Sequence, residues 1–175
     1  KARTIENDPQ HVEADAETAF RNPSEDYPVA VSVGSGVIND LCKLSSYHHG
    51  QSYISLPTAA SVDGYSSFGA SISYRNSKQT FSCPAPVAII ADIDVIAAAP
   101  KEMTAAGYAD LAAKIPAGAE WMIADLMGTE PIVPEAWHVL QDVLDSQLSD
   151  PEGVAAGNQK AVADLFEGLT LSGIA

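Results

Sequence analysis

The stretch GSGVIND, residues 34–40, holds residues whose types and spacing suit contact with a phosphate group. Gly34 and Gly36 let the backbone turn sharply and let a ligand approach it closely. Apolar residues at helical spacing follow, and the first turn of a helix offers unpaired amide groups and the positive end of its dipole. The full dinucleotide fingerprint, G-x-G-x-x-G, has a glycine where this sequence has Asn39. Taken alone, the stretch favours a plain strand-to-helix turn over a phosphate site.

A second polar segment, PTAASVDGYSS at residues 57–67, supplies one carboxylate, that of Asp63, and several hydroxyl groups. It follows a predicted strand, and ligands of open α/β sheets bind at the carboxyl ends of the strands. A polar surface loop with a turn at Asp63 and Gly64 explains the same residues. The sequence leaves both interpretations open.

Asp110, in the segment GYADLAAK at residues 107–114, is placed by this pattern at the start of a helix. Capping that helix is the simpler role for its carboxylate. The alternative is a metal ligand at the mouth of a cleft, but a catalytic zinc site normally needs three protein ligands. None of the four histidines, His11, His48, His49 and His138, has a convincing ligand spacing with Asp110. A serine hydrolase is disfavoured as well, because there is no G-x-S-x-G elbow.

The elements that must position these residues alternate between strands and helices in the first hundred residues. Apolar runs predict strands at 29–33, 52–58 and 86–92, with a helix at 37–47 between the first two. The β-branched run 29–33 predicts a strand buried on both faces of a parallel sheet. Residues 60–81 read as a long loop, with a hairpin around the sequence RNS as an alternative.

After Pro100 the sequence predicts only helices. The segment 101–128 is rich in alanine and is interrupted by Pro116, and Pro134 suits the first turn of another helix. Asn158 is a predicted N-cap, followed by apolar residues on one stripe, Val162, Leu165, Phe166 and Leu169. The predicted fold is therefore an α/β, Rossmann-like part with parallel strands, followed by an all-α part.

The composition excludes some function classes. A formal net charge of −14 argues against nonspecific binding to nucleic acid or to anionic membranes, which would be repelled. No apolar run is long enough to insert into a bilayer. The two cysteines, Cys42 and Cys83, form no C-x-x-C pair, so a reduced, cytoplasmic setting is expected. Because the sequence begins at Lys1 and ends in LTLSGIA without a polar cap, we expect a piece of a longer protein.

Four segments in this order, VGSGVINDLCK, SLPTAASVDGYSSFGAS, KQTFSCPAPVAIIADIDVIAAAPKEMTAAGYADLAAK and FEGLTLSGIA, resemble the sn-glycerol-1-phosphate dehydrogenases. These belong to the iron-containing alcohol dehydrogenase and dehydroquinate synthase-like superfamily. The resemblance runs from about residue 29 to the last residue. It implies a Rossmann-like cofactor domain, a helical domain and an active site in the cleft between them. It also implies reduction of dihydroxyacetone phosphate to sn-glycerol 1-phosphate by NADH or NADPH, usually with zinc.

The change to helices alone predicts a domain boundary near Pro100, in agreement with the two domains that the resemblance implies. Carried over residue by residue, the resemblance gives each part a role. Residues 1–100 would be the NAD(P)-binding domain, incomplete at its start, and 101–175 the beginning of a truncated metal and substrate domain. Asp63 would hydrogen-bond the hydroxyls of a small phosphorylated triose, and Asp110 would ligate zinc or another divalent metal and face the substrate. The cofactor contacts implied are Gly36, Val37, Ile38, Asn39 and Asp40 along the pyrophosphate, together with Thr58, Ser61 and Ser67. Lys78 resembles a basic position of the family. For the assembly of the protein, a homo-oligomer is one alternative.

The sequence departs from the family at three places. The first strand and helix of the family's cofactor domain are absent or reduced before residue 29, and Ala109 replaces a glycine. The two histidine ligands of the family lie beyond the last residue of this chain. Three alternatives therefore stay open: a dehydrogenase for glycerol or another unphosphorylated polyol, a dehydroquinate synthase-like enzyme, and a non-catalytic nucleotide-binding module.

Overall fold

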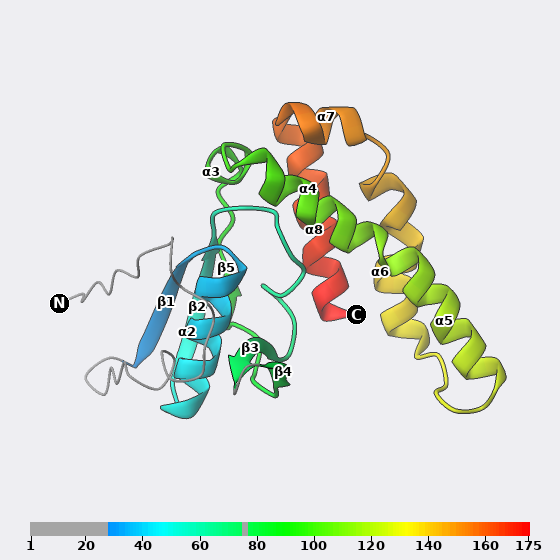
Figure 1. Ribbon diagram of the computed structural model, residues 1–175, viewed down its shortest axis with the longest axis horizontal. Helices are drawn as coiled ribbons and strands as arrows, with labels where there is room; N and C mark the ends of the chain where they lie inside the picture. Colours follow the sequence, from blue (N-terminus) through cyan, green and yellow to red (C-terminus); the bar gives the residue numbers. More distant parts are fainter. Residues whose placement is uncertain (1–27, 75–76) are drawn as a thin grey trace.

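The computed structural model describes residues 28–74 and 77–175. Three strands form a parallel sheet in the order β1 (Val29–Gly34), β2 (Ser52–Pro57) and β5 (Ala88–Ile89) (Figure 1). The parallel arrangement confirms the sequence prediction. The third strand is shorter than the predicted 86–92, although the amides of Val87 and Ile90 still donate to carbonyl oxygens of β2, each at 2.9 Å.

Helix α2 (Gly36–His48) connects β1 to β2 and covers one face of the sheet. Its side chains Leu41 and Leu44 pack on the hairpin formed by β3 (Ala70–Tyr74) and β4 (Ser77–Phe81). This antiparallel hairpin lies within the segment predicted as a long loop and confirms the one suggested around RNS.

Every described element after Pro100 is a helix, as the sequence predicts. A short helix, α3 (Ile93–Ala97), precedes that point. The helices that follow are α4 (Lys101–Ala112), α5 (Lys114–Leu126), α6 (Pro134–Gln147), α7 (Pro151–Ala156) and α8 (Gln159–Ile174). Pro134 is the first residue of α6, and the Asn158 side chain caps α8 by accepting from the amides of Lys160 and Ala161.

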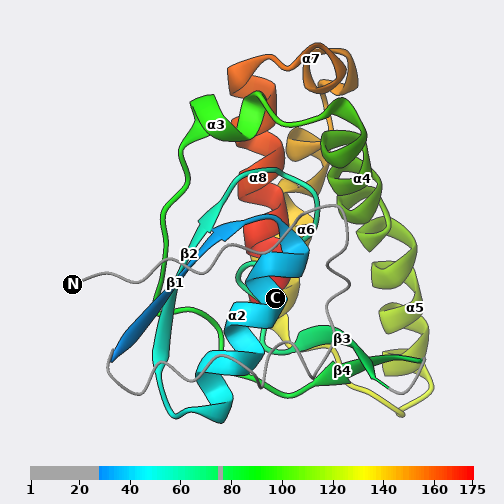
Figure 2. The ribbon, with the colours of Figure 1, turned by 60° about the vertical axis from the view of Figure 1, so that its left-hand side comes forward.

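Helix α8 forms the centre of the larger core. Its predicted apolar stripe is buried and packs on α3, α4, α6 and α7, which Figure 2 shows grouped around it. The loop after β2 joins the same core through Ala60 and Tyr65, and the Tyr65 and Phe166 rings lie 5.9 Å apart. The loop that carries the candidate site residues is therefore fixed against the helical part.

The prediction that β1 is buried on both faces is wrong. Side chains alternate between the two faces of a strand. Ser32 is buried, whereas Val29, Val31 and Val33 are 42%, 55% and 61% exposed. Helix α2 covers one face only, and no element within residues 28–74 and 77–175 covers the valine face of β1.

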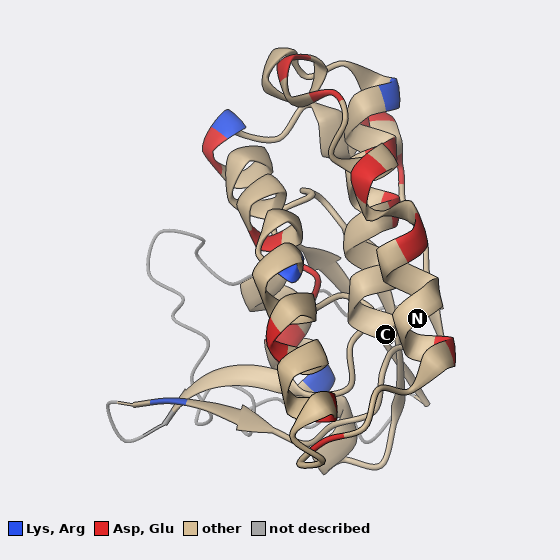
Figure 3. Cartoon of the chain, turned by 90° about the vertical axis from the view of Figure 1, so that its right-hand side faces the viewer, with Lys and Arg blue, Asp and Glu red and all other residues tan. Residues whose placement is uncertain are grey.

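The surface is acidic, in keeping with the net charge of −14. Figure 3 shows acidic segments spread along the helices, with few basic ones between them. Across the described ranges, none of the helices combines the length and the apolar character that crossing a bilayer requires.

Candidate functional site

The loop between β2 and β3, residues 58–69, lies against three helices. At Gly107 of α4, a Cβ atom would overlap the carbonyl oxygen of Ala60, so that helix touches the loop through its bare backbone. At Gly173 of α8, a Cβ atom would overlap the carbonyl oxygen of Asp63 in the same way. The third contact, from α2, is made by polar side chains. These close contacts fix the position of the loop.

Asp63 and Asp110, 47 residues apart, are brought together by this packing. The Asp63 amide donates to Asp110 Oδ2 at 2.9 Å. Lys114 Nζ lies 2.6 Å from Asp63 Oδ2 and 3.8 Å from Asp110 Oδ1, and Ser172 Oγ donates to Asp63 Oδ2 at 3.2 Å. We call these four residues, Asp63, Asp110, Lys114 and Ser172, the carboxylate cluster. It joins the loop to α4, α5 and α8, and its charged side chains are about one quarter exposed.

The predicted placement of Asp110 at the start of a helix is wrong. Helix α4 begins at Lys101 with Pro100 as its N-cap residue, so Asp110 lies in the last turn. A carboxylate there is unfavourable toward the negative end of the helix dipole. The ammonium of Lys114, four residues further on, offsets this and is the kind of i,i+4 partner that sequence spacing reveals.

The start of α2 lies beside the loop and has no side-chain cap among the described residues. Among the described residues, the Ser35 side chain makes no hydrogen bond that caps this helix, and Val37 is exposed. The loop approaches closely here, since a Cβ at Gly36 would lie 3.1 Å from Cγ2 of Val62. The Thr58 amide donates to the carbonyl oxygen of Gly34 at 3.2 Å. Hence α2 and the loop meet beside unblocked helix amides, an arrangement that suits a pyrophosphate.

The two other predicted hydroxyl contacts lie further along the loop. Ser61 is buried, and its hydroxyl lies 3.3 Å from that of Tyr65. Ser67 is half-buried and donates to the carbonyl oxygen of Gly64 at 3.3 Å. In this structure both hydroxyl groups contact the loop itself.

The side chain of Asn39 contacts the far half of the loop, and that of Asp40 contacts the start of β3. Asn39 is buried, accepts from Ser55 Oγ at 2.9 Å and donates to the carbonyl oxygen of Gly64 at 3.1 Å. Asp40 Oδ2 accepts from the Ser71 amide at 3.2 Å. Burial raises the pKa of the Asp40 carboxyl, and the nearby charge of Lys43 acts in the opposite direction.

Lys43 is a polar contact that the sequence reasoning missed. Its side chain is 1% exposed and donates to three carbonyl oxygens of the loop. The sequence does contain a signal for this contact. Polar residues recur at spacings of four and three at Asn39, Lys43 and Ser46, and this spacing places them in a row along one face of the helix. All three are buried.

The described residues do not form a metal site by themselves. Within residues 28–74 and 77–175, there is no group of three or more His, Cys, Asp and Glu side chains that could hold an ion. One oxygen of Asp110 accepts from the Asp63 amide, and the other faces Lys114. His138 instead lies 3.1 Å from Asp142 on the surface of α6.

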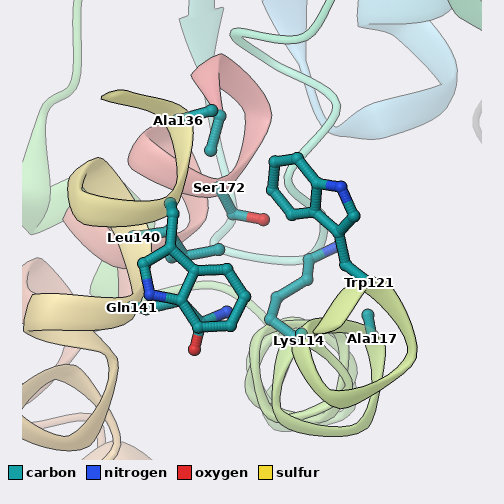
Figure 4. Close-up of a pocket in the computed structure, with 10 residues that line it drawn as sticks. Lys114, Ala117, Trp121, Ala136, Leu140, Gln141 and Ser172 are labelled. Atoms are coloured by element: carbon teal, nitrogen blue, oxygen red, sulfur yellow. The ribbon is translucent and has the colours of Figure 1, made fainter. Parts of the chain in front are cut away.

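A cavity of about 160 Å³ lies between α5 and α6, next to the carboxylate cluster. Figure 4 shows Lys114, Trp121 and Ser172 around it. The rings of Trp121 and Trp137 lie 6.0 Å apart and form much of its wall. Lys114 and Ser172 therefore belong both to the cluster and to the cavity lining.

Comparison with known proteins gives consistent matches. The family model described as iron-containing alcohol dehydrogenase matches residues 1–100. A glycerol-1-phosphate dehydrogenase, NAD(P)+, of Geobacillus thermodenitrificans is 40% identical over 150 residues, which are 86% of this chain and 37% of that protein. Another of the same name, from Pyrococcus horikoshii, is 36% identical over 146 residues, covering 83% of this chain and 42% of that protein. The chain thus spans about two fifths of the length of these relatives.

Solved structures agree in fold. The glycerol dehydrogenase of Schizosaccharomyces pombe matches with a TM-score of 0.69 at 22% identity, over 90% of this chain and 43% of that one. The iron-containing alcohol dehydrogenase of Thermotoga maritima matches with a TM-score of 0.56 at 18% identity, over 89% and 46%. At such identities the likeness establishes the fold alone, and it confirms the predicted order of an α/β part followed by a helical part.

Proposed function

This chain belongs to the iron-containing alcohol dehydrogenase family, and from that membership we propose that it carries the cofactor-binding part of an NAD(P)H-dependent glycerol-1-phosphate dehydrogenase. The reaction proposed is the reduction of dihydroxyacetone phosphate to sn-glycerol 1-phosphate, and its reverse. Relatives that bear the name of this enzyme are 35% to 40% identical to the chain. The observation that carries the proposal is the start of α2, which has no side-chain cap among the described residues, beside the loop that holds Asp63.

For the cofactor, we propose that the pyrophosphate lies along the first turn of α2. The backbone amides of Gly36, Val37 and Ile38 would donate to its oxygens, because the first amides of a helix have no partner within the helix. Asn39 and Asp40 follow this turn, and their side chains contact Gly64 of the loop and Ser71 of β3, respectively. Thr58, Ser61 and Ser67 are proposed as hydroxyl contacts from the facing loop.

For the substrate, we propose the carboxylate cluster. Asp63 would accept hydrogen bonds from substrate hydroxyls, and Asp110 would face the reacting carbonyl. Lys114 lies between the two carboxylates and partly neutralises them, so that an anionic triose phosphate is repelled less. We also propose Asp110 as one ligand of a divalent metal such as zinc, whose remaining ligands would come from outside the described residues.

The chemistry requires that a hydride donor and a carbonyl carbon be held in contact. When bound, NADH would supply the hydride for the carbonyl carbon, and a proton taken up from solvent would complete the alcohol. The residues of this chain would bind and orient the two reactants and keep water away from them. We propose that residues 1–100 provide the cofactor side of this site and that residues 101–175 begin the side that closes over the substrate.

The experiment that tests the proposal is a fluorescence titration of NADH with the chain and with two variants at the exposed Val37. Val37→Asp adds a carboxylate to the first turn of α2, where it favours the helix but repels a pyrophosphate. Val37→Ser is the matched neutral control. We expect saturable binding by the unmodified chain and by the control, and at least about tenfold weaker binding by Val37→Asp, which corresponds to about 1.4 kcal/mol. Equal affinity in both variants, or no saturable binding at all, would contradict the proposal.

A further inference from the structure

The ammonium group of Lys43 is the centre of the loop's internal hydrogen bonding. Its Nζ donates to the carbonyl oxygens of Gly64, Ser67 and Gly69 at 2.8, 2.7 and 2.9 Å. A lysine ammonium has three donors, and here all three go to one loop. The side chain is 1% exposed, so water does not replace these contacts.

A lysine so deeply buried needs a structural reason. Burial lowers the pKa of Lys43, because a charge is less stable away from water, while the carboxylate of Asp40 acts the other way. Three carbonyl dipoles that converge on one point would repel each other without a cation between them. The charge and the loop conformation therefore depend on each other.

The three acceptors lie where the loop shape matters. Gly64 directly follows Asp63, and its carbonyl oxygen also accepts from Asn39 at 3.1 Å. Ser67 is both an acceptor for Lys43 and a proposed cofactor contact. Gly69 has a φ of +120°, a conformation that favours glycine. Its amide donates to the carbonyl oxygen of Cys83 at 2.8 Å. The ammonium thus holds the stretch between the substrate side and the end of the loop.

We propose that Lys43 is a positioning residue, which fixes residues 64–69 and thereby sets Asp63 and Ser67 for substrate and cofactor. The last step of this inference rests on the proposed function. Helix α2 then acts at both ends of one site: its first turn faces the pyrophosphate, and its second holds the loop that completes the site. Lys43 touches neither reactant and acts only through the loop.

Two variants test this by hydrogen exchange of backbone amides and by NADH titration. Lys43→Met keeps the length and apolar stem but removes all three donors. Lys43→Arg keeps the charge, but its planar fork does not match three converging carbonyl groups. Lys101→Met, on an exposed lysine at the start of α4, is the matched control.

We expect exchange of the amides in 64–69 to become at least about tenfold faster in both Lys43 variants, with the amides of α8 unchanged. The dissociation constant for NADH should rise at least about tenfold in both variants and stay constant in Lys101→Met. Unchanged loop exchange would overturn the inference, as would faster exchange of α8 and the loop together, which would mark a general stability role. A loose loop with unchanged NADH affinity would overturn the link to the cofactor. If the unmodified chain does not bind NADH, the proposed function fails, while the exchange data still decide the role of Lys43 in the loop.

Discussion

At the scale of residues, Asp63 and Asp110 are two negative charges that share one ammonium. The pair between Lys114 and Asp63, at 2.6 Å, is half-buried, and the Asp63 amide ties the two carboxylates together. Without the ammonium, the two like charges would face each other across a short distance. This arrangement makes Lys114 important for stability even before any substrate is bound.

We therefore expect Lys114→Met to lower the free energy of unfolding by about 1 kcal/mol, a modest value because the groups are partly exposed to solvent. Lys114→Arg, which keeps the charge, serves as the control and should lose less. Urea unfolding at low and high salt measures the effect, which should shrink as salt screens the two carboxylates. A Lys114→Met variant as stable as the unmodified chain would contradict this account of the cluster.

Asp40 gives a prediction for pH. Burial raises the pKa of its carboxyl above 3.8, although Lys43, the Ser71 amide, Asn39 and Lys78 each act to lower it. The folded chain then binds this proton more tightly than the unfolded chain. The contribution of Asp40 to stability is consequently present below 3.8 and is lost as the pH rises through the higher, folded pKa.

Replacing the carboxyl removes this proton linkage. Relative to Asp40→Asn, the unmodified chain should lose unfolding free energy as the pH rises from 3.8 toward neutrality. Urea unfolding of both proteins at a series of pH values gives that difference directly. A difference that stays flat, or that grows in favour of the unmodified chain with rising pH, would show that burial does not dominate at Asp40.

At the scale of elements, two helix glycines differ in what surrounds them. A Cβ at Gly107 would meet the backbone of Ala60, which cannot move without shifting the loop. At Gly118 of α5, the nearest atoms belong to the end of the flexible Gln141 side chain, at 2.8 Å. The same substitution should thus have opposite effects at the two sites.

We expect Gly107→Ala to destabilise the chain by about 1–3 kcal/mol, because overpacking outweighs the gain in helix propensity. Gly118→Ala, the matched control, should be neutral or more stable by up to about 1 kcal/mol. Thermal or urea unfolding compares the two. Equal effects at both positions would mean that α4 does not touch the loop through its backbone.

The elements that sequence patterns predict well are those whose signals are local. The helix at 37–47, the cap at Asn158 and the apolar stripe of α8 follow from periodicity and capping chemistry. The break before Pro116 also has a local cause. Proline has no amide hydrogen to donate to the carbonyl oxygen of Ala112, and α4 ends at that residue. Apart from the placement of Asp110 within its helix, the predictions that failed depended on distant neighbours. The exposure of Val31 and the short β5 are set by what packs on the sheet, which the sequence of a strand does not encode.

The candidate site shows the same division. The glycine turn at 34–36 and the polar loop at 57–67 are visible in the sequence. Sequence patterns single out Asp63 and Asp110 separately, but their meeting across 47 residues follows from tertiary packing, and only the family resemblance assigned both to one site. Lys43 escaped notice because its partners are backbone carbonyl groups, which have no sequence signature of their own.

At the scale of the whole molecule, the loop packs a small parallel sheet against a helical part, and Ile89 of β5 and Ile93 of α3 pack on the same helical core. That loop contacts α2 on one side and α4 and α8 on the other, so the first turn of α2 and the carboxylate cluster lie at its two borders. We propose that this loop and the start of α2 form one nucleotide site. A bound cofactor should therefore change the environment of the backbone amides in both of these segments.

The most direct test is a titration of the isotope-labelled chain with NADH, followed by NMR of the backbone amides. We expect concentration-dependent shifts at residues 34–39 and at residues 58–67, with saturation at the dissociation constant found by fluorescence. The amides lining the cavity between α5 and α6, near Trp121 and Trp137, should change little. Shifts confined to that cavity, or none at the start of α2, would contradict the claim that this turn holds the cofactor.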